Sequence, residues 1–417
     1  MSAAKSQKNI LGLIAFIVFL DMMGVGLIIP VLPSLIAQLS DQSIDQAAST
    51  GGLILFGYAL MQFICSPIIG GLSDRFGRRP VLLLTLAAMG IDYLIMAWAP
   101  SLVWLFLGRL ISGAMGATWA AANSCIADIF LPEERGAKFG LLGAAGAAGL
   151  VLGPAIGGFL GDIGLRLPFL VAAVLALAGA VVGFFVFHET LPPEKRRTFS
   201  LARANPFGTL IQMSKIPLVI GLLSVIFLMQ LAGQSQMATW AYFLIAKFGW
   251  STLQIGLSVT LFGMMLALAQ GLLTGKAIAR FGARRAALYS MVFGLPSYLL
   301  LATAPAGWAI YLAIVIGGLS GVTFPALQGM MSDKISEDAQ GELQGAVASI
   351  MSLTAIIGPI VMTRIFSHFA DTSGVYFPGA PFLLATLLLI IAIALYQIVI
   401  RRIGEAPSLQ SQSSSQV

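Results

Sequence analysis

The stretch LSDRFGRRPVLLLT, residues 72–85, places four charged side chains inside a long apolar sequence. They are Asp74, Arg75, Arg78 and Arg79. A weaker copy, IARFGARRAALYS, occupies residues 278–290 and carries Ala279 where the first copy has Asp74. Glycine follows Arg-Phe in both copies, and glycine allows a turn in which other residues would be strained. Both stretches are therefore predicted to be polar turns between apolar helices.

The composition is that of an integral membrane protein. Hydrophobic residues make up 58% of the 417 residues, charged residues make up 10%, and the mean hydropathy is +0.93. A soluble domain carries about 25% charged residues. A spanning helix needs about 20 apolar residues, and the chain divides into twelve such runs. We place them at residues 9–31, 52–71, 80–98, 101–127, 138–160, 167–187, 216–245, 253–278, 285–303, 307–331, 344–367 and 378–400.

The basic residues predict the orientation of the chain. With twelve spans and the N-terminus inside, 19 of the 23 Lys and Arg residues fall on the cytoplasmic side. Arg166 and Lys247 would face outward, and Arg109 and Arg364 would lie inside spans. An excess of Lys and Arg in cytoplasmic loops is the usual bias of membrane proteins. The net charge of +6 therefore reports topology rather than nucleic-acid binding, and both termini are predicted to be cytoplasmic.

Few residues suit metal binding or catalysis. Cys65 and Cys125 fall inside predicted spans, which favours buried free thiols over a disulfide. The two histidines, His188 and His368, lie near helix ends, and no group of Cys, His and carboxylates has metal-ligand spacing. The run after Lys5 and Lys8 continues without a cleavage site, so it is predicted to stay as the first helix. We expect no metal, no cofactor and no enzymatic activity.

The chain contains an internal repeat. Residues 75–77 recur at 280–282, an offset of 205 positions. The same offset relates Gly116, Thr118 and Asp128 to Gly321, Thr323 and Asp333, and Gly136, Gly140, Gly153 and Pro154 to Gly341, Gly345, Gly358 and Pro359. Separated matches at one offset indicate a duplicated six-helix unit. We divide the chain into a first half (1–188), a cytoplasmic linker (189–215), a second half (216–402) and a disordered polar tail (403–417).

Three ionisable residues fall inside predicted spans of the first half: Asp21, Asp92 and Arg109. Counted from the outer turn near Pro100, Asp92 and Arg109 both lie roughly 12–14 Å deep, so they can face each other. Asp21 reaches a comparable level on the first helix. Two carboxylates near one guanidinium leave one acid without a counter-ion, which is what a proton-coupling group requires. The alternative is a static Asp92–Arg109 pair that holds the hairpin, with Asp21 lining water.

Several motifs resemble the major facilitator superfamily. GGLSDRFGRRP (70–80) matches its most specific signature, GRLISGAMGA (108–117) resembles its fourth helix, and GLVLGPAIGG (149–158) resembles the fifth helix of its drug/proton antiporters. Narrower matches resemble the tetracycline-resistance efflux family. They are LDMMGVGLIIPVLP (20–33), YALMQFICSP (58–67), IDYLIMA (91–97), FPALQGMMS (324–332) and GELQGAVASIMSLTAIIGP (341–359). The resemblance implies an all-helical membrane fold with twelve spans in two six-helix repeats.

The resemblance also implies a conformational gate at the first charged turn. Its residues would be Gly70, Asp74, Arg75, Gly77, Arg78, Arg79 and Asp128. The glycines would let the backbones approach and turn sharply. Arg78 and Asp128 would form a pair that breaks during transport, while Asp74 would contact a helix end of the second half. The alternative is that this turn only fixes topology through its positive charge.

Glycines of the fifth predicted span form a smooth helix face. They are Gly149, Gly153, Gly157 and Gly158, together with Pro154. Such a face allows close helix packing, and the proline removes one backbone hydrogen bond. Packing across the interface of the halves could seal a leak path, and the matching Gly358-Pro359 favours a symmetric interface. Tight packing alone is the alternative.

The substrate cavity is assigned from the resemblance, which implies that spans one, four, seven and ten line it. Their polar and aromatic residues, with two from the second span, are Met22, Tyr58, Gln62, Thr118, Trp119, Asn123, Gln230, Gln234, Gln236, Trp240, Thr323, Phe324 and Gln328. Aromatic faces with scattered hydrogen-bonding groups suit an amphipathic, ring-bearing molecule. Each glutamine could equally bond to a neighbouring helix.

The chain departs from the tetracycline exporters in its second half. That family carries an acid in the ninth helix and a histidine in the eighth, whereas residues 291–302 and 262–271 contain neither. Gly294 and Leu266 occupy the corresponding positions. Proton coupling in the second half, and tetracycline itself as cargo, are therefore open.

We predict a proton-coupled exporter of amphipathic small molecules that works by alternating access. Its partners would be the substrate, protons and the lipid bilayer, with no nucleic acid, and it would be a monomer. The resemblance places it in a bacterial inner membrane. The alternatives are a uniporter, a carrier of another metabolite or sugar, and a transport-inactive membrane receptor.

Overall fold

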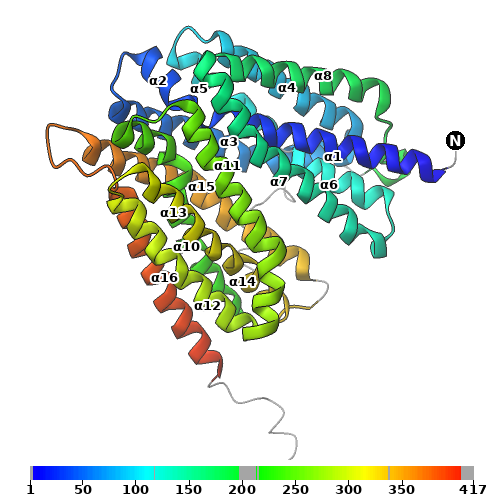
Figure 1. The fold of residues 1–417 in the computed structure, drawn as a ribbon. Coiled ribbons are helices and arrows are strands. Elements are labelled where there is room, and N and C mark those ends of the chain that lie inside the picture. The colour runs from blue at the N-terminus through cyan, green and yellow to red at the C-terminus, as the bar shows by residue number, and fades with distance from the viewer. Residues whose placement is uncertain (1–2, 117, 197–212, 214–215, 337–338, 405–417) are drawn as a thin grey trace, which may run out of the picture. The chain divides into compact units, whose positions relative to one another are not determined.

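The computed structural model describes residues 3–116, 118–196, 213, 216–336 and 339–404 (Figure 1). Within these residues the chain is helical and contains no strand. The predicted all-helical fold is therefore confirmed. Most of the predicted linker and all but the first two residues of the predicted tail lie outside the described residues.

The helices follow the predicted order of spans. Those of the first half are α1 (Ala3–Ile28), α2 (Leu32–Ser40), α3 (Ile44–Phe76), α4 (Arg78–Trp98), α5 (Leu102–Met115), α6 (Thr118–Ile129), α7 (Pro132–Ile163) and α8 (Leu167–Val186), followed by the short η1 (Pro193–Lys195). Those of the second half are α10 (Pro217–Phe248), α11 (Thr252–Leu268), the π-helical η3 (Ala269–Leu273), α12 (Thr274–Thr303), α13 (Gly307–Gly318), η4 (Leu319–Val322), α14 (Thr323–Ser332), α15 (Gln340–Ala370) and α16 (Ala380–Gly404).

Ten described helical stretches are long and apolar enough to cross a membrane. One of them, Thr252–Thr303, has 52 residues, about 78 Å of helix and more than twice the hydrocarbon thickness. It contains the turn at Gly282, so it makes two crossings. The short α5 is continued by α6, and together they cover the predicted fourth span. These two cases reconcile the ten stretches with the twelve predicted spans.

Both predicted turns have the same backbone geometry. Gly77 has φ 108° and ψ 159°, and Gly282 has φ 75° and ψ 156°. Positive φ values are reached readily by glycine and at a cost by residues with a Cβ. The repeat inferred from sequence therefore recurs in the backbone at the expected offset.

The predicted boundaries differ from the helix ends where polar residues extend a helix past its apolar run. The second span was placed at 52–71, but α3 covers Ile44–Phe76 and includes polar turns at both ends. The short α2 lies between predicted spans. It begins with Pro33 in its first turn, where a missing N–H costs nothing, and it ends at Asp41 with a left-handed φ of 52°.

The described chain packs as two units. The first comprises residues 1–205, 235–264 and 355–381, and the second comprises 206–234, 265–354 and 382–417. These units cut across α10, α11, α15 and the start of α16, so parts of second-half helices pack with the first half of the sequence. The division at the sequence repeat stays a prediction.

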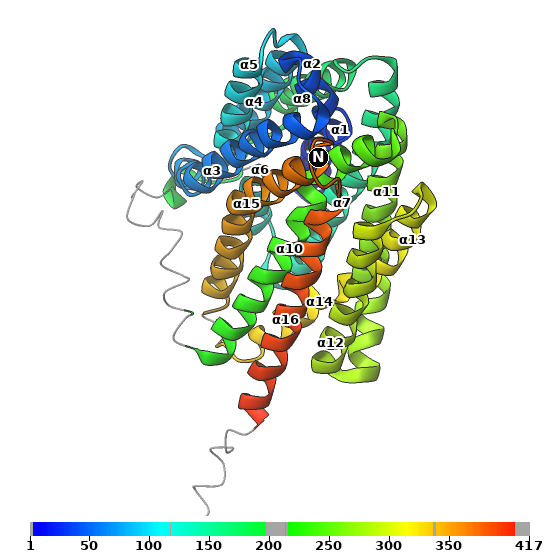
Figure 2. The same ribbon diagram turned by 90° about the vertical axis from the view of Figure 1, so that its left-hand side faces the viewer.

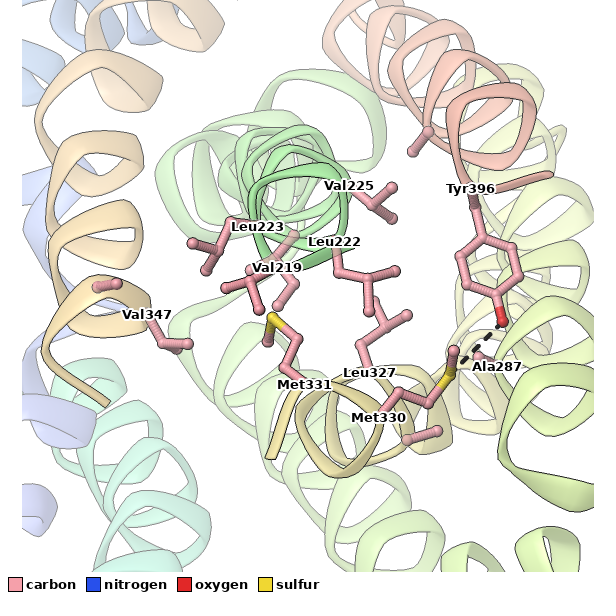
Figure 3. Close-up of a cluster of buried hydrophobic side chains, with 14 of the residues drawn as sticks. Val219, Leu222, Leu223, Val225, Ala287, Leu327, Met330, Met331, Val347 and Tyr396 are labelled. Carbon is pink, nitrogen blue, oxygen red and sulfur yellow. Dashed lines mark hydrogen bonds between the residues drawn. The ribbon is translucent and has the colours of Figure 1, made fainter. Parts of the chain in front are cut away.

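The first unit is built around α1, which lies beside α7 (Figure 1). The second unit has its own apolar core, in which Leu222 of α10, Leu327 and Met331 of α14 and Tyr396 of α16 meet (Figure 3). The Tyr396 hydroxyl donates to the Arg284 carbonyl at 2.8 Å and lies 3.7 Å from the Met330 sulfur. In the same unit, α10 runs beside α16, where Gly221 faces Val399 (Figure 2).

Candidate functional site

A buried ion pair joins α4 to α5. The Arg109 guanidinium donates to the Asp92 carboxylate. Asp92 is fully buried and Arg109 is 8% exposed. Gly108 makes room for the acid, because a Cβ at this position would lie 2.5 Å from Asp92 Oδ1. The predicted contact between the two residues is therefore present.

Two tyrosines enclose the arginine of this pair. The Arg109 guanidinium lies 5.7 Å from the ring centroid of Tyr58 on α3 and 5.9 Å from that of Tyr93 on α4. A cation over an aromatic face is attracted by the ring, more strongly where water is absent. Gln62 lies one turn from Tyr58 and donates to the Gly116 carbonyl at 3.2 Å. Helices α3, α4 and α5 thus place the Arg109 guanidinium close to the rings of Tyr58 and Tyr93.

Asp21 of α1 belongs to the same cluster but not to the ion pair. It is 7% exposed, and it has no hydrogen-bond or ion-pair partner among the described residues. Tyr58 and Tyr93 lie within electrostatic reach of both Asp21 and Arg109. Of the two acids predicted near Arg109, Asp92 therefore pairs with it directly and Asp21 does not. An unpaired acid at this depth is costly when it is charged.

The contact predicted between Arg78 and Asp128 at the first charged turn is also present. Arg78 Nε donates to Asp128 Oδ2 of α6 at 2.9 Å, and Arg78 Nη1 lies 2.6 Å from Asp74 Oδ1. The Ser73 hydroxyl lies 3.2 Å from Arg78 Nη1. The turn therefore holds three helices, α3, α4 and α6, through one guanidinium. The contact of Asp74 with a helix end of the second half stays a prediction.

The glycines of this turn differ in their roles. At Gly77 a Cβ would clash with the Glu189 carboxylate, whose Cδ would lie 2.7 Å away. At Gly70 a Cβ would meet nothing within 4 Å, so the close approach expected there is absent. Arg75 is exposed and lies over the Phe76 ring at 5.1 Å. Only Gly77 is required by its surroundings.

Glu189 is a member of this turn that the sequence analysis missed. Its carboxylate accepts from the backbone N–H groups of Arg78 at 2.9 Å and Arg79 at 3.3 Å, the first residues of α4. A carboxylate at a helix N-terminus satisfies free N–H groups and complements the helix dipole. The available signal was an acid placed directly after α8, on the predicted side of the charged turn. Its partners are more than a hundred positions away, so no local motif marks it.

The glycine face of α7 packs against α1. A Cβ at Gly153 would lie 2.6 Å from the Met23 carbonyl oxygen and 2.9 Å from the Gly26 Cα. At Gly149 the nearest groups include Met23 N at 2.9 Å, and at Gly157 the Leu27 Cα lies at 2.7 Å. The predicted close packing of this face is present, since each glycine meets backbone.

The same helix crosses α11, which belongs to the second sequence repeat. A Cβ at Gly158 would lie 3.0 Å from the Leu253 Cα, and Gly256 lies against the Pro154 carbonyl. A matching crossing joins α15 to α3, where a Cβ at Gly52 would lie 3.0 Å from the Pro359 carbonyl oxygen. The two prolines are one repeat offset apart. Both crossings lie within the first packing unit, and a role at a symmetric interface of the two sequence halves stays a prediction.

Asp162, at the end of α7, was also missed. Its carboxylate accepts from the Thr252 hydroxyl at 2.5 Å, the Ser251 hydroxyl at 3.0 Å and the Leu253 N–H at 3.3 Å. These groups form the first turn of α11, so Asp162 caps that helix from another element. The contact joins the C-terminal end of α7 to α11 of the second repeat.

The predicted cavity residues occupy different environments. Those in the first unit are Met22, Tyr58, Gln62, Thr118, Trp119, Asn123, Gln236 and Trp240, and those in the second are Gln230, Gln234, Thr323, Phe324 and Gln328. Trp119 is 39% exposed, whereas Thr118, Trp240 and Thr323 are buried. A cavity shared by all of them stays a prediction.

Three of these residues bond to neighbouring helices. Trp240 Nε1 donates to the Ser258 hydroxyl at 2.9 Å, Thr323 Oγ1 donates to the Ser290 hydroxyl at 2.8 Å, and Gln328 Nε2 donates to Gln344 Oε1 at 2.8 Å. Phe324 packs on the core of the second unit. Gln236 and Trp240 line a cavity of about 40 Å³, too small for a drug-sized molecule. Several side chains that the sequence assigned to the substrate cavity are therefore engaged in contacts between neighbouring helices.

Comparisons with known proteins agree with this architecture. Residues 14–359 and 222–415 match the model of the Major Facilitator Superfamily. The class C tetracycline resistance protein of Escherichia coli is 43% identical over 366 residues, covering 88% of this chain and 92% of that protein. The class G protein of Vibrio anguillarum is 40% identical, covering 84% and 88%. The crystal structure of a bacterial homologue of the human lysosomal transporter Spinster, inward-facing and unoccupied, superposes with a TM-score of 0.77 at 19% identity, covering 96% and 98%.

Proposed function

This chain belongs to the Major Facilitator Superfamily, and we propose that it exports an amphipathic, tetracycline-like molecule in exchange for protons. It is a multi-pass membrane transporter and not an enzyme. The tetracycline resistance proteins that it resembles over most of its length support this class of cargo. The finer features, namely a bacterial inner membrane, both termini in the cytoplasm and a monomeric state, belong to the proposal.

The observation that carries the proposal is the buried cluster of Asp21, Asp92 and Arg109. One acid is neutralised by the guanidinium, and the other has no partner among the described residues. Charge at this depth is costly unless it is paired or hydrated, and such residues mark proton paths in transporters. We propose that Asp21 or Asp92 gains and loses the proton. Asp21 is favoured because it has no described partner, whereas a proton on Asp92 would break its ion pair with Arg109.

The charged turn supplies the conformational side of the cycle. Arg78 ties α4 to α3 and α6, and its bond to Asp128 is the contact proposed to break and reform. A carrier must expose its site to one side at a time, and a ligand shifts such an equilibrium only through differential affinity for the two states. A proton on Asp21 would supply that difference.

The second half is not expected to bind a proton at the position used by tetracycline exporters. Gly294 is buried, and a Cβ there would lie 2.8 Å from Leu389 Cδ2. An acid would not fit without repacking, so we place proton coupling in the first half alone. Because the chain lacks the acid of the tetracycline exporters at this position, we do not restrict the proposed cargo to tetracycline itself.

Proton movement in everted vesicles tests the proposal. Vesicles with a pH-sensitive dye are challenged with magnesium-tetracycline, other cationic and neutral drugs, and sugars. Compound-triggered proton efflux in wild type, lost in Asp92→Asn and Asp21→Asn but kept in the matched Ser297→Ala control, is the expected result. Exchange of labelled compound without a proton signal would leave a uniporter. No movement of any compound would favour a transport-inactive receptor.

A further inference from the structure

A groove of about 800 Å³ runs between α4 and α8, away from the charged cluster. Its floor is apolar and includes Leu83, Ala87, Leu177 and Ala180. Two of its walls, Leu84 and Val181, are 59% and 57% exposed, which in a membrane-spanning helix means contact with lipid. The groove therefore opens toward the bilayer.

The mouth of this groove is charged. Arg79, Arg196 and Glu189 lie there, beside Phe184. The Arg79 guanidinium donates through Nη2 to the Phe184 carbonyl at 2.6 Å and lies 5.3 Å from the centre of the Phe184 ring. Arg79 Nε is buried without a partner among the described residues. A guanidinium carries five N–H donors, so Arg79 has donors to spare.

The other two charged residues, Glu189 and Arg196, form no ion pair with each other in the described chain, although both lie beside Gly77. The Glu189 carboxylate accepts four backbone N–H groups, those of Arg78, Arg79, Thr190 and Leu191. The Glu189 carboxylate therefore interacts with the N-terminal N–H groups of α4. The Arg196 guanidinium forms no ion pair in the part of the chain that the structure describes. The mouth thus presents two cations that have free donors.

We propose that this groove binds one anionic phospholipid, with its phosphate between Arg79 and Arg196 and one acyl chain on the apolar floor. The depth fits, because Ala87 lies two turns beyond Arg79, about 12 Å further into the hydrocarbon. Guanidinium groups pair with phosphate oxygens in a fixed geometry. Basic sites between helices at the cytoplasmic surface bind anionic headgroups. The inner-leaflet location rests on the proposed orientation of the chain.

Lipid retention measures this site without transport. Full-length protein is purified in mild detergent, delipidated, and titrated with phosphatidylglycerol or phosphatidylcholine, and bound lipid is counted by native mass spectrometry. Wild type is expected to keep one phosphatidylglycerol in preference to phosphatidylcholine. Arg196→Gln should weaken phosphatidylglycerol binding by about fivefold, the expected effect of one surface cation. Arg401→Gln, at the exposed end of α16, is the matched control and should change nothing.

Two groove-filling variants test the acyl chain. Ala180→Trp and Ala87→Trp, on the α8 and α4 sides of the floor, should each abolish retention of both lipids while the thermal unfolding temperature stays near that of wild type. Equal retention of the two lipids by wild type, or unchanged retention in Arg196→Gln, overturns the proposal. So does cross-linking of residues 197–212 into the groove without bound lipid, since this chain would then be the occupant. Failure of proton-coupled export leaves these readouts unaffected.

Discussion

The turns at Gly77 and Gly282 share one backbone path but not one chemistry. At the first, a single arginine bonds to acids on α3 and α6, and Glu189 caps the following helix. At the second, no described acid forms an ion pair, and Phe281 stacks edge-on against Tyr289 at 5.6 Å instead. Both copies therefore share the turn that glycine provides and both carry arginines, but only the first has the acid at position 74 and the described ion pairs.

The intramembrane positions show the same difference. Asp92 and Arg109 correspond, at the offset of 205, to Ser297 and Ile314. There a neutral bond replaces the ion pair, because the Ser297 hydroxyl donates to the Ala313 carbonyl at 2.8 Å. The first repeat thus carries the ionisable residues that we propose exchange protons, and the second carries a neutral hydrogen bond at the matching position.

The largest expected effect comes from removing one member of the buried pair. Asp92→Leu leaves Arg109 charged and unpaired, which should cost about 3–5 kcal/mol of stability and abolish transport. Thermal unfolding in detergent and vesicle uptake measure the two losses. The double variant Asp92→Leu/Arg109→Met should regain stability but not transport. If it regained both, the Asp92–Arg109 pair would have only a structural role, and its presence in the first repeat alone would not explain proton coupling.

The next effect concerns the charged turn. Arg78→Gln removes the bonds to Asp74 and Asp128, and charged hydrogen bonds of this kind contribute about 1.5–3 kcal/mol. At the offset of 205, Arg78 corresponds to Ala283, so the comparison in the second repeat is made at the neighbouring arginine. Arg284→Gln removes an exposed side chain that forms no ion pair with described residues. Chemical denaturation should therefore separate the two variants. Equal midpoints would show that the two turns are energetically equivalent.

A smaller effect is expected at the cap of α4. Glu189→Gln removes the negative charge at the helix N-terminus while leaving an oxygen to accept hydrogen bonds, and should cost about 1 kcal/mol. Glu194→Gln, exposed in the same segment, serves as the control. Hydrogen exchange at the N–H groups of Arg78 and Arg79 should rise only in the first variant; unchanged exchange would remove Glu189 from the turn.

The smallest effect should come from Ser297→Ala. The Ala313 carbonyl also lies in α13, where it accepts from the helix backbone, so losing the hydroxyl should cost below about 1 kcal/mol. Transport should persist, as measured in the same vesicles. Loss of transport in this variant would indicate that the second half takes part in proton coupling, contrary to the proposed restriction to the first half.

Much of the fold followed from elementary patterns, because bilayer thickness fixes helix length and glycine marks the turns. The repeat offset identified both turns and paired Pro154 with Pro359, while the helices that cross at these prolines were found only in the structure. Glu189 and Asp162 escaped because each caps a helix that is distant in sequence, and an acid beside a helix end has no periodic signal. The cavity assignment was the least specific, since the same polar side chain can bond to a neighbouring helix, as Thr323 does.

The crossings of α7 with α11 and of α15 with α3 consist of backbone meeting backbone. At Gly52, Gly158 and Gly256 a single added carbon would meet main-chain atoms that cannot turn away. These glycine positions are therefore expected to tolerate few substitutions, whereas the exposed Trp119 and the partly exposed glutamines among the predicted cavity residues have room to vary. A mutant library meant to change what the pump carries should spare the first set and randomise the second.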